Sequence, residues 1–181
     1  MIIALLAAVA TATCTLEQHS VRISWTAFKT NQKMAVSGSF TKVKVEGKTK
    51  AESLSKLIQG LKVTIDPASV QTGNPGRDAT IAEAFFKKID GISGEVVSIS
   101  EKTLTLALQF NKQLKNVPLH LTVTNKKNFQ ATGSIDIRHF QAQDALQSLS
   151  ERCQDLHRGP DGASKTWPDV ELSLSGTINC G

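Results

Sequence analysis

Short runs in which apolar and polar residues alternate recur along most of this sequence. One run places Leu104, Leu106, Leu108 and Phe110 at every second position, with mostly polar residues between them. Successive side chains of a β-strand point to opposite faces of the sheet, so each run predicts a strand with one apolar and one polar face. Similar runs occupy residues 21–27, 117–123, 129–137 and 170–178.

Runs of this kind predict an all-β fold, in which an eight-stranded antiparallel barrel closes around its apolar face. The interior of such a barrel is just wide enough to be filled by side chains or to hold one slender ligand. The function is therefore expected inside the barrel.

Strand bounds and a few short helices can be predicted along the rest of the chain. Strands are expected at 34–45, 61–65 and 92–100, and the middle runs above are expected to form strands at 103–109, 119–125 and 129–138. Helical spacing predicts short helices at 51–59, from an N-cap at Asp78 to about residue 89, and at 144–157. The last of these helices is inserted before the final strand.

Composition favours a single soluble folded domain and argues against a nucleic-acid partner. The chain has 181 residues with no proline-rich or low-complexity linker, so residues 13–181 are expected to form a single domain. Its net charge is +5, but the lysines are scattered over turns and polar faces, and only 5% of residues are aromatic. A nucleic-acid-binding protein would more often show a basic stripe with stacking aromatics, so no nucleic-acid partner is expected.

The first twelve residues are mostly apolar and too few to cross a bilayer as a helix. They resemble the apolar part of a secretory signal peptide, and Ala10-Thr11-Ala12 provides small residues at a cleavage site. We therefore expect residues 1–12 to be a signal peptide, the protein to be periplasmic or secreted, and no integral membrane segment to remain.

The chain contains three cysteines, Cys14, Cys153 and Cys180. In a barrel with an even number of strands the last strand closes against the first, which predicts a Cys14–Cys180 disulfide across that seam. Two alternatives remain open at this point: a lipid-modified Cys14, and a disulfide between Cys153 and Cys180.

Catalytic and metal-binding patterns are weak in this sequence. His19, His120, His139 and His157 are scattered without metal-ligand spacing, so no metal site is expected. Cys153 and His157 stand four residues apart and could meet on one helix, but no orienting group or oxyanion site accompanies them. No catalytic residue and no cofactor are therefore predicted.

Several short motifs resemble those of the YceI-like family of lipocalin-like, polyisoprenoid-binding exported proteins. They are His19-Ser20-Val21 followed by Trp25, Gly38-x-Phe40, Val63-x-Ile65-Asp66-Pro67-Ala68-Ser69-Val70, Thr72-Gly73-Asn74, Arg77-Asp78 and Phe85-Phe86. The resemblance implies a lipocalin-like barrel that encloses a long apolar chain, such as an isoprenoid, a quinone tail or a fatty acyl derivative. The sequence departs from the common pattern in its three cysteines and in the long segment 142–165 before the last strand.

The leading hypothesis is noncatalytic binding or transport of one long-chain amphiphile, with a homodimer left open. The alternatives are an enzyme that acts on a similar substrate inside the barrel, and a packed barrel that serves as an interaction module. The expected ligand-binding residues are Trp25, Phe28, Phe40, Phe85, Phe86, Leu106, Leu108, Phe110, Leu119, Leu121, Phe129 and Ile137, with Arg77 near the headgroup.

Overall fold

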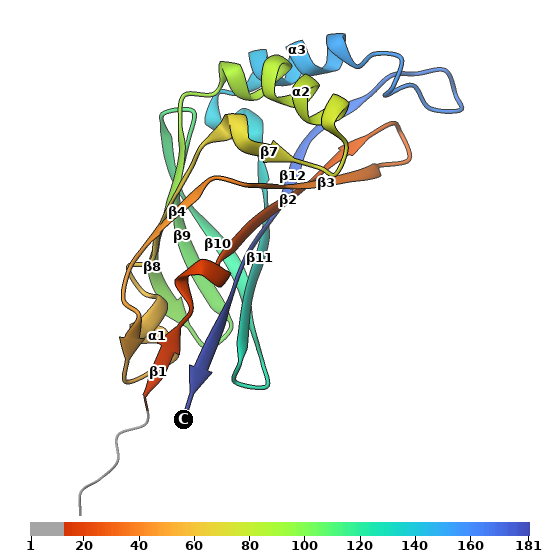
Figure 1. Ribbon diagram of the computed structural model, residues 1–181. Helices are drawn as coiled ribbons and strands as arrows, with labels where there is room; N and C mark the ends of the chain where they lie inside the picture. The colour runs from red at the N-terminus through yellow and green to blue at the C-terminus, as the bar shows by residue number, and fades with distance from the viewer. Residues whose placement is uncertain (1–12) are drawn as a thin grey trace, which may run out of the picture.

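The alternating runs form the strands of one antiparallel sheet that curls around an apolar interior, as Figure 1 shows. The computed structural model describes residues 13–181, so the predicted signal peptide at residues 1–12 lies outside the described residues. The sheet contains twelve strands in this part of the chain. They are β1 (Cys14–Leu16), β2 (Arg22–Lys29), β3 (Met34–Phe40), β4 (Val43–Glu46), β5 (Lys50–Ala51), β6 (Lys62–Ile65), β7 (Val70–Gln71), β8 (Ile92–Ser100), β9 (Thr103–Phe110), β10 (Gln113–Thr124), β11 (Asn128–Asp136) and β12 (Thr166–Cys180).

Three α-helices and four 3₁₀ turns complete the described fold. They are α1 (Leu54–Ile58), α2 (Pro75–Ala84), α3 (Gln143–Arg152), η1 (Gln18–Ser20), η2 (Pro67–Ser69), η3 (Phe86–Lys88) and η4 (Ile137–Phe140). Figure 1 shows α2 and α3 across one end of the barrel, and α1 at the opposite end beside β1. The two ends of the barrel are therefore covered by different elements.

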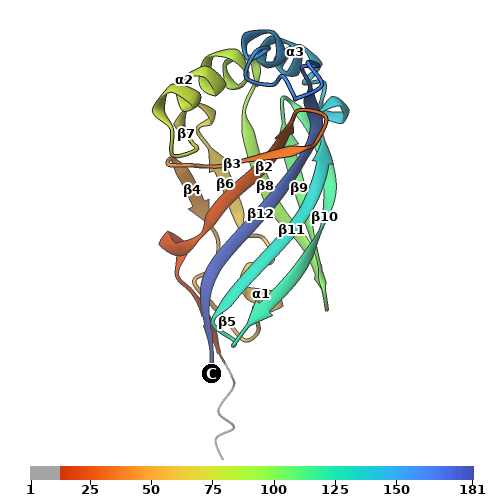
Figure 2. The same ribbon diagram turned by 90° about the vertical axis from the view of Figure 1, so that its right-hand side faces the viewer.

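The strand order is β4-β6-β8-β9-β10-β11-β12-β2-β3-β7, with β1 joined to β12 and β5. Figure 2 shows β3, β2, β12, β11 and β10 side by side across one wall. This topology confirms the predicted antiparallel, lipocalin-like barrel with a helix inserted before the last strand. The strand count is higher than eight because short strands such as β1, β5 and β7 join the long ones, and because one predicted strand is divided.

The predicted strand 34–45 is divided into β3 and β4 by a break at Thr41 and Lys42. At this break the backbone N–H groups bond to another segment: Thr41 donates to the Ser69 carbonyl at 3.0 Å, and Lys42 to the Ser69 hydroxyl at 3.1 Å. At this break the turn η2, and not a neighbouring strand, accepts the backbone hydrogen bonds. As a result β3 pairs with β2 and β7, while β4 pairs with β6.

The predicted N-cap of the second helix at Asp78 is wrong. The N-cap of helix α2 is Asn74, four residues before Asp78. The Asn74 side chain accepts a hydrogen bond from the Arg77 N–H at 3.0 Å, and Pro75 occupies the first turn. Asp78 instead accepts hydrogen bonds from the backbone and hydroxyl of Thr72. The Thr72-Gly73-Asn74 segment is therefore held against the first turn of α2.

The half of the barrel near α1 is filled by side chains. Leu57 and Ile58 of α1 are fully buried, and Phe129 is 1% exposed. An atom added as Cβ on Gly176 would lie 2.7 Å from the Phe129 ring, so the ring packs directly against the backbone of β12. This half of the interior is a packed core.

Gly38 on β3 provides a similar close contact for Trp25 on β2. The two residues are paired across β2 and β3, and a Cβ on Gly38 would lie 2.4 Å from the Trp25 ring. We expect Gly38→Val to displace this ring and lower the free energy of unfolding by about 1–3 kcal/mol. Thermal unfolding followed by tryptophan fluorescence checks this, with Gly76→Ala as a control because a Cβ there meets only Asn74, at 3.5 Å. An unchanged stability in Gly38→Val would contradict the expected clash.

Candidate functional site

A cavity of about 430 Å³ lies between the sheet and the helices α2 and α3. Its wall is mostly apolar and comes from β2, β3, β6 and β8 to β12, with Phe85 and Phe86, which directly follow α2, also in the lining. Pockets of this size and apolar character are typical of small-molecule sites. The unfilled part of the interior is therefore the half beneath α2 and α3.

Five phenylalanines form a continuous chain of ring contacts, and four of them line one side of this cavity. The ring centroids of Phe40 and Phe86 are 5.3 Å apart, those of Phe85 and Phe86 5.1 Å, and those of Phe85 and Phe110 6.4 Å. Phe110 continues the chain to Phe140 at 5.8 Å. Three of these four contacts are edge-to-face, an arrangement that favours fixed ring orientations, so this wall is preformed.

Most of the residues expected from the sequence to bind ligand line this cavity. These are Trp25, Phe28, Phe40, Phe85, Phe86, Leu106, Leu108, Phe110, Leu119, Ile137 and Arg77. Leu121 and Phe129 are not among the lining residues: both are buried in the core, and Phe129 packs against Gly176. Alternation correctly assigned these two side chains to the inward face, but they lie in the filled half of the barrel.

A cluster of polar side chains at the end of the cavity was not predicted as a binding site. It consists of Lys29, Cys153, His157 and Thr166, and all four line the cavity. Lys29 and Thr166 are paired across β2 and β12, and the His157 Nδ1 lies 2.7 Å from the Thr166 hydroxyl. The Lys29 ammonium donates to the Leu156 carbonyl at 3.0 Å. These bonds join the end of β2 to the segment that follows α3.

The same segment shows why the predicted helix 144–157 is shorter than expected. Helix α3 ends at Arg152, and the following turn places the Leu156 carbonyl beside Lys29 and the His157 ring beside Thr166. Side-chain hydrogen bonds thus replace the last helical turn. The i, i+4 spacing of Cys153 and His157 was the one sequence signal for this cluster.

Cys153 and His157 do not form an activated nucleophile–base pair. Burial raises the pKa of the Cys153 thiol, and Lys29 and Arg152 offset this only in part. Burial lowers the pKa of His157, and the Lys29 charge lowers it further. A reactive thiolate beside an imidazolium would need a lowered thiol pKa and a raised imidazole pKa, the reverse of both shifts. Both groups are therefore neutral at pH 7.

The lowered pKa of His157 predicts a pH-dependent stability. In the unfolded chain His157 takes up a proton below about pH 6.5, whereas burial in the folded state opposes protonation. The contribution of neutral His157 to the free energy of unfolding is therefore present above that pH and is lost as the pH falls below it. We expect the free energy of unfolding to fall less between about pH 7.5 and about pH 5 in His157→Gln than in the wild type. Urea unfolding at the two pH values measures this. His120→Gln, at an exposed histidine on β10, should behave as the wild type.

Arg77 lies at the first turn of α2 and also lines the cavity. Its Nε donates to the Thr72 hydroxyl at 2.8 Å and its Nη2 to the Thr72 carbonyl at 2.9 Å. A guanidinium has five N–H donors, so further donors remain for another partner. The side chain is held in place by its own turn and is exposed to solvent.

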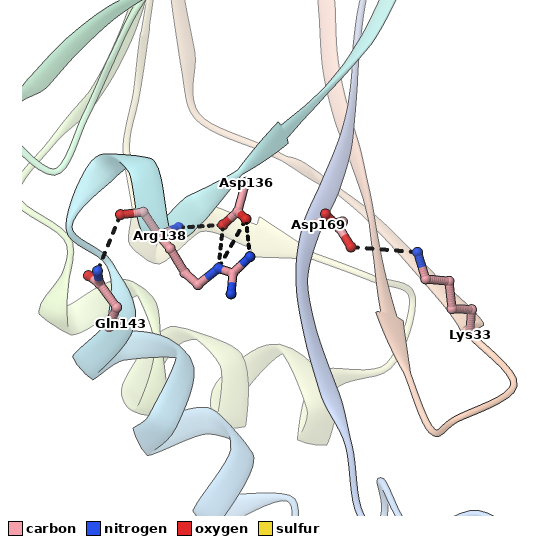
Figure 3. A network of polar contacts seen from close by, with 5 residues as sticks. All are labelled: Lys33, Asp136, Arg138, Gln143 and Asp169. Atoms are coloured by element: carbon pink, nitrogen blue, oxygen red, sulfur yellow. Dashed lines mark hydrogen bonds and ion pairs between the residues drawn. The ribbon is translucent and has the colours of Figure 1, made fainter.

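Ion pairs and hydrogen bonds fix the loops around the same end of the barrel. Figure 3 shows Arg138 paired with Asp136, the Gln143 side chain donating to the Arg138 carbonyl at 3.3 Å, and Lys33 lying 3.5 Å from Asp169. The Arg138 guanidinium, through its hydrogen bonds, lowers the pKa of Asp136. Trp167 donates to the Thr30 carbonyl at 2.7 Å. The start of α3 and the β2–β3 hairpin are thereby tied to the sheet.

Residues 13–181 lack two features, a metal-binding cluster and a membrane-spanning helix. This part of the chain holds no group of three or more histidine, cysteine or acidic side chains placed to bind a metal ion. None of its helices is long and apolar enough to span a membrane.

The fold and cavity define an antiparallel barrel with a preformed apolar chamber. The family model described as "YceI-like domain" matches residues 14–177, and the chain therefore belongs to the YceI-like family. No curated protein matches the sequence.

Solved structures share this fold at low sequence identity. A polyisoprenoid binding domain from Saccharophagus degradans, implicated in plant cell wall breakdown, has a TM-score of 0.60 and 9% identity, over 93% of this chain and 98% of that chain. BcnA of Burkholderia cenocepacia has a TM-score of 0.59 and 14% identity, over 90% of this chain and 98% of that chain. The YCEI protein of Campylobacter jejuni has a TM-score of 0.50 and 20% identity, over 78% and 84%. At these identities the likeness establishes the fold alone.

Proposed function

We propose that this protein binds one long-chain amphiphile, such as an isoprenoid, a quinone tail or a fatty acyl derivative, in the barrel cavity, as a noncatalytic carrier. The observation that carries the proposal is the preformed, mostly apolar cavity of about 430 Å³ beneath α2 and α3. Membership of the YceI-like family and the polyisoprenoid binding domain among the structural neighbours support lipid binding in general.

The energetics of an apolar chain suit this chamber. Burial of a hydrocarbon chain gains roughly 0.8 kcal/mol per CH₂, so a ten-carbon stretch has about 8 kcal/mol of gross transfer energy. Even after the costs of association, this permits useful affinity without any hydrogen bond. The twelve residues proposed to contact the chain and headgroup are Trp25, Phe28, Phe40, Phe85, Phe86, Leu106, Leu108, Phe110, Leu119, Ile137, Lys29 and Arg77.

The neutral state of Cys153 and His157 supports binding rather than catalysis. A buried thiol with a raised pKa is a poor nucleophile, and the His157 ring is hydrogen-bonded through Nδ1 to the Thr166 hydroxyl. The Cys14–Cys180 disulfide supports the proposed periplasmic or secreted location, because such bonds persist in oxidising compartments.

Native mass spectrometry of the gently purified protein, beside organic extraction and lipid analysis of the same sample, tests the proposal. We expect one long-chain species bound at about one per chain and recovered in the extract. A protein that carries no ligand and also fails to bind added prenyl and fatty chains would overturn the carrier function.

A further inference from the structure

The charged residues that line the cavity are all basic. Lys29 and Arg77 are both in the lining, and no aspartate or glutamate is among the described residues that form it. The remaining polar lining groups are neutral, and His157 is among them. The chamber is therefore apolar along its length and positively charged at its polar end.

Lys29 is the more enclosed of the two cations. It is the last residue of β2 and is partly buried, whereas Arg77 is exposed. Its ammonium donates to the Leu156 carbonyl at 3.0 Å and forms no ion pair within residues 13–181. A lysine ammonium has three donors, so two remain available to a ligand at this end of the cavity.

The carboxylates on neighbouring segments do not neutralise this charge. Asp155 pairs with Arg158, Asp169 with Lys33, and Asp161 accepts from Asn31. The charge of Lys29 acts on the cavity wall: it offsets part of the rise that burial causes in the pKa of Cys153, and it adds to the lowering that burial causes in the pKa of His157. A partly buried cation without an anionic partner is costly, and a ligand anion would supply that partner.

We propose that Lys29 makes this cavity selective for amphiphiles with an anionic headgroup, a carboxylate or phosphate placed at the Lys29, His157 and Thr166 cluster with the apolar chain inside the barrel. This inference rests on the proposed lipid-binding function and specifies its ligand class. Arg77, on α2, is the second cation that lines this cavity.

Three twelve-carbon probes that differ only in headgroup charge test the inference: laurate, dodecanol and dodecylammonium. Each is titrated into delipidated protein below its aggregation concentration, with the fluorescence of Trp25 and Trp167 as readout, because both side chains line the cavity. We expect laurate to bind more tightly than dodecanol, and dodecylammonium to bind most weakly. Dodecyl phosphate in place of laurate distinguishes phosphate from carboxylate preference.

The variant Lys29→Met, which removes the charge but keeps an extended side chain, should weaken laurate binding by about tenfold and weaken dodecanol binding much less. Lys29→Arg should retain the preference for laurate. Lys115→Met removes an equal charge from an exposed position on β10 and should leave all three affinities unchanged. If Lys29→Met does not fold, added salt on the wild type gives the same information, because it should weaken laurate binding only.

The possible failures are distinguishable. Equal affinity of the wild type for all three probes, or an unchanged laurate preference in folded Lys29→Met, would overturn the headgroup inference and leave the carrier function standing. Failure of all three probes, together with longer prenyl and fatty chains, would overturn the carrier function itself.

Discussion

Removal of the Cys14–Cys180 disulfide is expected to lower the free energy of unfolding by about 5 kcal/mol, because the bond closes a loop with a sequence separation of 166 residues. In the chain-entropy model, a cross-link of this length strongly restricts the unfolded chain. The two cysteines are directly paired between β1 and β12, with their Cα atoms 4.1 Å apart. The total stability of a domain is about 5–15 kcal/mol, so the loss would be a large share of it.

The double variant Cys14→Ser/Cys180→Ser measures this effect by urea unfolding without leaving a lone reactive thiol from the pair. Cys153→Ser serves as the control, because it retains the disulfide and alters a cysteine that is buried and free. We expect the double variant to unfold at a much lower urea concentration than this control. A difference of less than about 1 kcal/mol would show that the paired strands, and not the cross-link, hold the seam.

Leu106→Arg is expected to abolish binding of an apolar chain. Leu106 lines the cavity from β9 and is 8% exposed, and its side chain approaches the backbone of β8 at Gly94, where a Cβ would lie 3.0 Å away. An arginine at this position places an unpaired charge against the proposed hydrocarbon chain, and charge transfer into an apolar site is strongly unfavourable. Calorimetric titration with a prenyl or fatty ligand gives the affinity.

Leu114→Arg is the matched control, because Leu114 is 68% exposed on β10. It introduces the same residue without entering the cavity and should bind ligand as the wild type does. Ala27→Phe provides an uncharged test, since Ala27 also lines the cavity and a larger side chain there removes part of its volume. Full ligand binding by folded Leu106→Arg would place the ligand outside this chamber.

Strand positions were predictable where most of a run alternates. The expected strands 92–100 and 103–109 agree closely with β8 (Ile92–Ser100) and β9 (Thr103–Phe110). Burial alternates along β9 and along β8 up to an irregularity between Val96 and Ser98, and a short hairpin joins the two strands. The strand at 34–45 was not predicted correctly. Its break depends on hydrogen bonds to Ser69, a residue distant in sequence, and no local pattern reveals such a partner.

The lining of the cavity was only partly predictable for a related reason. Alternation shows which side chains face inward, but the height of each along the barrel axis depends on strand register. Phe129 and Leu106 look equivalent in the sequence, yet Phe129 packs against Gly176 while Leu106 borders open space. The Lys29 cluster was missed because β2 and the segment after α3 meet only in the folded chain.

Strand β12 lies between β11 and β2, and it also pairs with β1. In its pairing with β2, Leu174 is opposite Ile23 and Leu172 opposite Trp25, so residues about 150 positions apart share one ladder. The ribosome therefore releases β2 long before the partner strand that completes its wall exists. Until then the edge of β2 that pairs with β12 keeps its backbone N–H and C=O groups unpaired, so the emerging chain carries an open strand edge until its last strand is made.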